Sequence, residues 1–154
     1  MEDESQDAVE ALYRTQGERI WRAVMAYTQD PDLASDAVAE AFAQALVRGS
    51  AIRSPARWVW RTAFRIAAGM LQERSRSVRL AGTESYLMRD LGGELLTGLA
   101  RLPAKQRAAL VLFYYADYPV RQIAEILRSN PIAVRVNLSR GRNRLRRILE
   151  EKHA

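Results

Sequence analysis

The fold of this chain is decided by residues 120–142, which read VRQIAEILRSNPIAVRVNLSRGR. A short segment with helical spacing of its apolar residues ends near Arg128 and is followed by Ser129-Asn130-Pro131. Asn is a favoured helix cap and Pro is favoured at the first helical position, so a longer basic helix is expected from Pro131 to about Glu150. A short helix, a tight break and a longer basic helix together predict a helix-turn-helix.

These two helices are expected to pack at a steep angle, with the small Ala124 at the point where they cross. Many helix-turn-helix units have Gly in the turn, because the chain needs a positive φ there. Here Arg128 or Ser129 is expected to take that conformation, with some strain. The apolar positions that fit the packing are Ile123, Ala124, Leu127, Val134 and Leu138.

The second helix is strongly basic, with no acidic residue between Leu127 and Glu150. Its start would enter the major groove of DNA, and its later arginines would meet phosphates. A simpler interpretation is an amphipathic helix that only keeps a helical bundle in solution. The polar side chains concerned are Arg135, Asn137, Arg140, Arg142, Arg144, Arg146 and Arg147.

The N-terminal half predicts three helices and no strand, because no segment alternates with a period of two. The helices are expected over Asp7–Gln29, from Asp30-Pro31 to Arg48-Gly49, and from Ser54-Pro55 onward. Asp30 and Ser54 can each cap a helix that begins at the following Pro. Three amphipathic helices of this kind can bury one core.

The third of these helices is expected to bury two adjacent rows of residues and to carry an Arg ridge on another side. The first row is Trp58, Thr62, Ile66 and Met70, and the second is Val59, Ala63, Ala67 and Leu71. The ridge consists of Arg57, Arg61 and Arg65, each four residues from the next.

Residues 76–93 lose the helical periodicity and are richer in Gly and Ser, which indicates a linker with a short helical turn around Tyr86–Leu91. The chain is therefore predicted to be all-α, with two small helical domains joined by a flexible linker. The expected domains are residues 1–76 and 94–154, the second containing the helix-turn-helix, and the linker is residues 77–93. A helix is also expected over Glu94–Arg101.

Charge is unevenly distributed along the 154 residues. Of the 24 basic residues only Lys105 and Lys152 are lysines, and Arg is suited to forked contacts with phosphates and guanine edges. The net charge is −7 over residues 1–47, +7 over 48–79, zero over 80–127 and +6 over 128–154. A compositional bias toward Arg would raise the total, but two separate Arg-rich blocks suggest two contacts with one long polyanion.

The composition excludes several classes of protein. There is no Cys, and the single His153 lies next to the C-terminus, so neither disulfides nor thiolate metal sites are expected. The carboxylates are scattered and no Gly-rich phosphate loop is present, so we expect no catalytic site, no cofactor and no small-molecule substrate. No apolar run approaches the roughly 20 residues of a membrane span, and Met1-Glu2-Asp3-Glu4 is unlike a signal peptide. A cytoplasmic protein without membrane insertion, and not an enzyme, is expected.

Three stretches resemble an extracytoplasmic-function sigma factor, one group of the bacterial sigma-70 family of promoter-specificity subunits. Residues 34–42, ASDAVAEAF, resemble the acidic helix of the family's second conserved region, and residues 57–63, RWVWRTA, resemble the start of its DNA-melting helix. Residues 102–142 resemble the fourth region in the order and spacing of their motifs, including the Leu102-Pro103 start. The resemblance runs from about Leu12 to Leu149.

The resemblance implies two contacts with promoter DNA. The helix-turn-helix would read the −35 element through Arg135, Val136, Asn137, Ser139, Arg140, Arg142 and Arg144. Of these, Arg135, Val136, Ser139 and Arg140 would face bases, and Arg142 and Arg144 would face phosphates. The first basic block would hold the −10 element through Arg48, Ser50, Arg53, Arg57, Trp58, Arg61 and Arg65, and the loop of residues 48–54 would capture a flipped-out base.

The resemblance also implies protein partners. Asp36, Glu40 and Phe42 would dock on the clamp of bacterial core RNA polymerase. The protein would bring the polymerase to a promoter and help to open the duplex, and it would be associated with the nucleoid during transcription. An anti-sigma factor is a further partner that the family implies.

Several residues depart from the family pattern. Ala39 stands where the family has Gln, and Arg65 and Gly69 stand where the melting helix has Asn and Asp. Val136 and Asn137 replace a Ser-Arg pair, and Asn137 can pair with adenine whereas Val136 can contact only a thymine methyl. Two other functions therefore stay open: a stand-alone helix-turn-helix regulator, which would need a dimer face or a ligand pocket, and a sigma-like decoy that sequesters a regulator.

Overall fold

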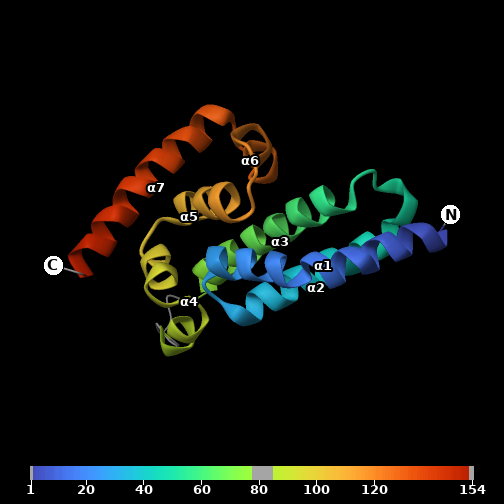
Figure 1. Cartoon of the computed structure of the whole chain (residues 1–154), viewed down its shortest axis with the longest axis horizontal. Coiled ribbons are helices and arrows are strands. Elements are labelled where there is room, and N and C mark those ends of the chain that lie inside the picture. Colours follow the sequence, from blue (N-terminus) through green and yellow to red (C-terminus); the bar gives the residue numbers. More distant parts are fainter. Residues whose placement is uncertain (1, 78–84, 153–154) are drawn as a thin grey trace. The chain divides into compact units, whose positions relative to one another are not determined.

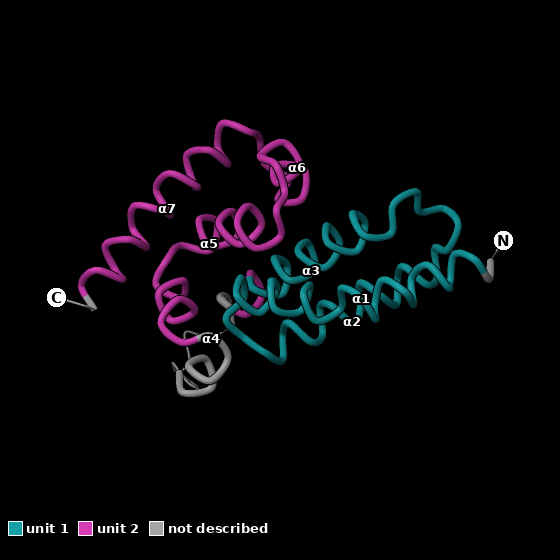
Figure 2. Tube along the Cα trace, viewed as in Figure 1, with its two compact units in different colours: residues 1–71 teal, residues 72–154 magenta. Residues whose placement is uncertain are grey.

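The computed structural model describes residues 2–77 and 85–152, which form helices joined by short connections (Figure 1). These residues contain no strand, so the predicted all-α class is confirmed. None of their helices is both long enough and apolar enough to cross a membrane. The chain divides into two compact units, residues 1–71 and residues 72–154 (Figure 2).

The first unit is built from α1 (Glu2–Thr28), α2 (Pro31–Arg48) and most of α3 (Pro55–Ser77). The expected cap of α2 is present, because the Asp30 carboxylate accepts the backbone N–H of Asp32 at 3.0 Å. The helix ends where the sequence placed its end. Gly49 follows it with φ 52° and opens a single 3-10 turn, η1 (Gly49–Ala51).

The core of this unit corrects the predicted face of α3. Phe64 is fully buried and Trp60 is 3% exposed, whereas Trp58, expected in a core row, is only half-buried. The Phe64 ring stacks on Tyr27 with ring centroids 5.3 Å apart, and the Trp60 indole N–H donates to Gln16 Oε1 at 3.2 Å. Packing against Tyr27 and Gln16 of α1 removes the Trp60 and Phe64 rings from water, whereas Trp58 lies on a different side of α3. The predicted residues Val59, Ala63 and Ala67 are buried beside them.

The second unit contains α4 (Ser85–Ala100), α5 (Ala104–Leu110), the π turn η2 (Val111–Tyr115), α6 (Val120–Ile126) and α7 (Pro131–Lys152). The long α7 packs against α4, α5 and α6. Helix α4 is interrupted at Gly93, where φ is 63°, so its last part begins where the sequence predicted a helix from Glu94.

Two glycines allow the close packing of α7 in this unit. A Cβ at Gly141 would lie 3.1 Å from Leu110 Cδ1 of α5, and a Cβ at Gly98 of α4 would lie 3.0 Å from Leu145 Cδ1 of α7. Both distances are shorter than ordinary carbon contacts. A side chain at either position would therefore require the facing Leu side chain to shift by a few tenths of an ångström.

The division between the units lies after Leu71, whereas the expected first domain ends at residue 76. Helix α3 continues without a break across this boundary to Ser77. Of the predicted linker, residues 78–84 lie outside the described residues, and residues 85–93 belong to α4.

Candidate nucleic-acid interface

The helix-turn-helix of the second unit consists of α6, a turn over residues 127–130 and α7. Four of the five predicted packing residues are buried, and the fifth, Leu127, is half-buried at the start of the turn. The buried four are Ile123, Ala124, Val134 and Leu138.

The turn is closed by a Schellman motif centred on Arg128, which has φ 53°. The Ser129 N–H donates to the carbonyl of Ala124 at 2.8 Å, and the Arg128 N–H donates to the carbonyl of Glu125 at 3.3 Å. A left-handed conformation costs a residue with a Cβ about 1–2 kcal/mol. Of the two residues predicted to take this conformation, the structure therefore selects Arg128.

The start of α7 is held by a side-chain cap. Asn130 Oδ1 accepts the backbone N–H of Ala133 at 2.9 Å, as expected for a capping Asn. Pro131 is the first residue of the helix. The Schellman turn on one side and this cap on the other determine the direction in which the first turn of α7 points.

The face of α7 that points away from its unit begins with apolar residues and is flanked by arginines on both sides. Ile132, Val136, Ser139 and Asn143 lie along the outward line, because residues three or four apart share a helix face. All four are exposed. One flank carries Arg135, Arg142 and Arg146, and the other carries Arg140, Arg144 and Arg147.

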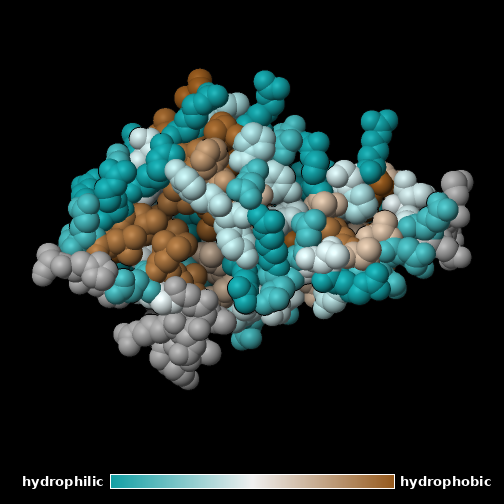
Figure 3. Space-filling view, in the orientation of Figure 1, coloured by the Kyte–Doolittle hydropathy of each residue, from teal (hydrophilic) through white to brown (hydrophobic). Residues whose placement is uncertain are grey.

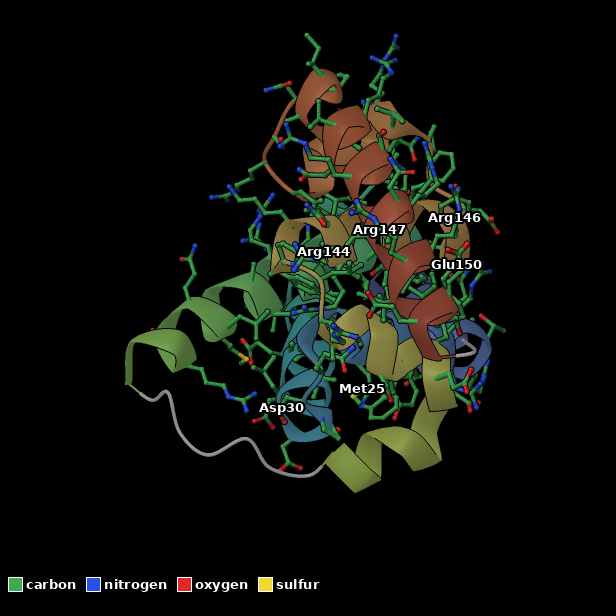
Figure 4. All side chains as sticks on the ribbon, turned by 90° about the vertical axis from the view of Figure 1, so that its left-hand side faces the viewer. Met25, Asp30, Arg144, Arg146, Arg147 and Glu150 are labelled. Carbon is green, nitrogen blue, oxygen red and sulfur yellow. The ribbon has the colours of Figure 1, made fainter. Side chains whose placement is uncertain are left out.

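The figures show this arrangement from two sides. In Figure 4, Arg144 and Arg147 lie on one side of the α7 ribbon and Arg146 lies on the other. Figure 3 shows a largely hydrophilic surface along α7, with apolar atoms beneath it. The outward face of α7 is therefore a basic surface that faces solvent along most of the helix.

The structure distinguishes between the residues predicted for the −35 element. Arg135, Val136, Ser139, Arg140 and Arg144 are exposed. In contrast, Asn137 is half-buried on the inner edge of the helix. Arg142 is exposed, and its Nη1 donates to the Tyr114 hydroxyl of η2 at 3.0 Å. This bond fixes the Arg142 guanidinium close to the body of the unit.

Ile132 is a residue of this surface that was not predicted from the sequence. Its side chain is 73% exposed at the second position of α7. Its position in the sequence could have identified it. Ile132 precedes Val136 by four residues and does not share the buried face of Val134 and Leu138.

In the first unit, the basic loop between α2 and α3 has a defined structure. The Arg48 guanidinium lies 5.6 Å from the centre of the Trp58 ring, a cation–π contact that joins the end of α2 to the start of α3. Ser50 and Arg53 are exposed in the connection between them. The loop therefore presents hydroxyl and guanidinium groups around a half-buried indole.

The predicted Arg ridge of α3 follows this loop but is not uniform. Arg57 and Arg65 are exposed, whereas Arg61 is half-buried. The Arg61 Nε is buried and has no hydrogen-bond partner in the part of the chain that the structure describes. A buried guanidinium nitrogen without a partner is costly.

On α2, the residues predicted to dock a partner fall into two groups. Asp36 and Glu40 are exposed one turn apart, and Glu40 Oε1 accepts the Gln44 amide N–H at 3.0 Å. Phe42 is only 6% exposed, and its ring meets Tyr13 edge-on with centroids 5.1 Å apart. The prediction for Phe42 is therefore corrected: its ring packs α2 against α1 and does not share the acidic face.

The sequence of the second unit resembles a known family. Residues 86–145 match the family described as Sigma-70, region 4. These 60 of the 154 residues are similar to sigma-70 region 4. They include the helix-turn-helix and the first two thirds of α7, and with them most of the basic surface described above.

Two solved structures resemble the whole chain. One is the sigma factor RpoE, crystallised with the anti-sigma factor NepR from Bartonella quintana; the TM-score is 0.75 at 18% identity, over 94% of this chain and 98% of that one. The other is CnrH in complex with the cytosolic domain of CnrY; the TM-score is 0.71 at 19% identity, over 97% of this chain and 92% of that one. No curated protein matches the chain in sequence.

Together, the region 4 match and the fold support the predicted resemblance to extracytoplasmic-function sigma factors of the sigma-70 family. Members of this family regulate transcription and are not enzymes. Within the described residues, no three His, Cys, Asp or Glu side chains gather in a way that could hold a metal ion.

Proposed function

We propose that this chain is a sigma factor that binds bacterial core RNA polymerase, directs it to promoters and helps to open the DNA there. The observation that carries the proposal is a region 4 domain whose α7 presents exposed arginines on both sides of its outward face. A second helical unit in the same chain has its own basic loop. Such a protein works in the cytoplasm and associates with the nucleoid during transcription.

The region 4 domain would read the −35 element. A recognition helix enters the major groove with its N-terminal residues against the base edges. The outward line of α7, with Arg135 and Arg140 beside it near the helix start, would then meet the bases, and the later arginines of both flanks would meet the phosphates of the two strands. Arg135, Val136, Ser139 and Arg140 are the exposed base-reading candidates near the helix start, while Arg144 lies farther along for phosphate.

The first unit would act at the −10 element. Extruding a base from a duplex costs a few kcal/mol, which stacking and edge contacts must offset. The exposed Ser50 and Arg53, and the Arg48 guanidinium held on Trp58, provide polar groups for such a base and its phosphates.

The acidic face of α2 would dock on the polymerase. The charge-reversing substitution Asp36→Arg should weaken binding to core polymerase about tenfold or more, because like charges across an interface disfavour docking. Asp36 is exposed, so the fold should be retained. Affinity is measured by fluorescence anisotropy of the labelled full chain titrated with core polymerase.

The matched control for this experiment is Glu10→Arg, which makes the same change of charge at an exposed position of α1. We expect it to leave the affinity within about twofold of the wild type. Equal weakening by both variants would mean that only the net charge of the unit matters. Unchanged binding by Asp36→Arg would remove the docking assignment.

A protein inhibitor is a further proposed partner. The sigma factor RpoE was solved with an anti-sigma factor, and CnrH was solved with the cytosolic domain of CnrY. Because this chain shares their fold, we propose that a protein of the same kind binds it and keeps it from the polymerase.

The proposal is tested by reconstitution with core polymerase and a library of promoter fragments, followed by mapping of transcript starts. We expect defined start sites that appear only when the chain is added. Binding to the polymerase without any start site would favour the decoy. Specific DNA binding without affinity for the polymerase would favour a stand-alone regulator.

A further inference from the structure

Two branched aliphatic side chains stand on the surface at the start of α7. Ile132 is 73% exposed and Val136 is 39% exposed. They are four residues apart and are therefore neighbours on one helix face. The buried face of the same helix is formed by Val134 and Leu138, so neither Ile132 nor Val136 contributes to the core of the unit.

The surroundings of this pair are strongly basic. Arg135 lies on one flank and Arg140 on the other, and Ser139 continues the outward line. Figure 3 shows apolar atoms protruding among hydrophilic ones where α7 begins. An apolar pair between arginines suits a ligand that is anionic at its edges and carries apolar groups at its centre.

The major groove of DNA has this character. Its edges are phosphates, and the thymine C5-methyl is the apolar group that a base pair presents there. Four residues of α-helix rise about 6 Å, and successive bases of a strand are about 3.4 Å apart along the axis. The two side chains therefore match methyl groups that are one or two base-pair steps apart.

We propose that Ile132 and Val136 select thymines at two nearby positions of the −35 element by contact with their C5-methyl groups. This inference rests on the proposed DNA-binding function. The later arginines of the two flanks, Arg146 and Arg144 among them, hold the backbones of the two strands, and the Asn130 cap and the Arg128 turn fix the direction of the first turn of α7. The aliphatic pair then adds selection for thymine to the base reading by Arg135 and Arg140.

The experiment uses the full chain with core polymerase and a randomised DNA duplex. Bound sequences are selected, and each thymine of the selected upstream element is then replaced by deoxyuridine, which removes only the methyl group. We expect the replacement to matter at two positions. At each of them it should lower the affinity of the wild-type protein about three- to fivefold, as for the loss of one buried methyl group.

Variants identify the protein side of each contact. Ile132→Ala should abolish the effect of deoxyuridine at one of the two positions and Val136→Ala at the other. Leu95→Ala is the matched control, because Leu95 is an exposed aliphatic residue of the same unit, 54% exposed on α4. This control should keep the wild-type sensitivity at both positions.

Two results would overturn this inference but leave the proposed function in place. In the first, the selected sites bind equally well with deoxyuridine; in the second, the alanine variants stay as sensitive to deoxyuridine as the wild type. Alanine variants that lose transcription but keep their affinity for DNA would also overturn it, by showing that the pair contacts a protein. A chain that selects no DNA sequence would overturn the proposed function together with this inference.

Discussion

Arg128 holds a left-handed conformation in the turn between α6 and α7, a position where Gly would be unstrained. We expect Arg128→Gly to raise the free energy of unfolding by about 0.5–1 kcal/mol, because it removes the Cβ clash that strains the turn. Arg128→Ala removes the same guanidinium but keeps the Cβ, so it should give no such gain. Urea unfolding followed by circular dichroism measures both, and equal effects would show that the turn is not strained.

Arg140 and Arg144 differ in their distance from the outward line of α7, although both are exposed. We expect Arg140→Ala to cost roughly 1–3 kcal/mol in binding to the upstream element and to relax the base preference at one position. We expect Arg144→Ala to weaken binding to all DNA sequences alike and to reduce the slope of log K against log salt concentration by about one.

Competition binding with single-base variants of the selected element, at several salt concentrations, measures both properties. A uniform loss of affinity for Arg140→Ala would assign that residue to phosphate. A changed base preference for Arg144→Ala would place it at a base edge instead.

At the scale of elements, the packing of α7 on α5 depends on Gly141. We expect Gly141→Val to lower the free energy of unfolding by about 2 kcal/mol, because its side chain would meet Leu110 and Gln106 of α5. The control is Gly69→Val on the exposed side of α3, where nothing lies within 4 Å of an added Cβ. Thermal unfolding should show little change for the control. Similar losses of stability at both positions would indicate that the low helix propensity of Val, and not the contact between α5 and α7, is responsible.

Some features of these elements follow from neighbouring residues, and others do not. Asp30-Pro31 and Asn130-Pro131 mark the starts of α2 and α7, because a cap and a first-position Pro act within one turn. The buried side of α3 was predicted only in part. Apolar residues recur at helical spacing on more than one side of α3. The side that carries Trp60 and Phe64 is buried because it packs against Tyr27 and Gln16 of α1.

At the scale of the whole molecule, each of the two units has its own core, which predicts two unfolding transitions in calorimetry. Phe64→Ala should lower the transition of the first unit and leave the other in place, since a large core truncation costs about 3–5 kcal/mol. Leu112→Ala, at a fully buried position of the second unit, should do the reverse. A single transition shifted by either variant would show that the units unfold together.

The sequence by itself determined the all-α class, the helix-turn-helix and the two basic blocks. These depend on helical periodicity, on caps and on charge, which are local properties of the chain. Tertiary structure decided that Phe42 is buried, that Asn137 lies at an inner edge and that Ile132 stands on the surface. The reason is that exposure depends on which distant residues cover a side chain, and a helix of the same sequence can be covered on different sides by different neighbours.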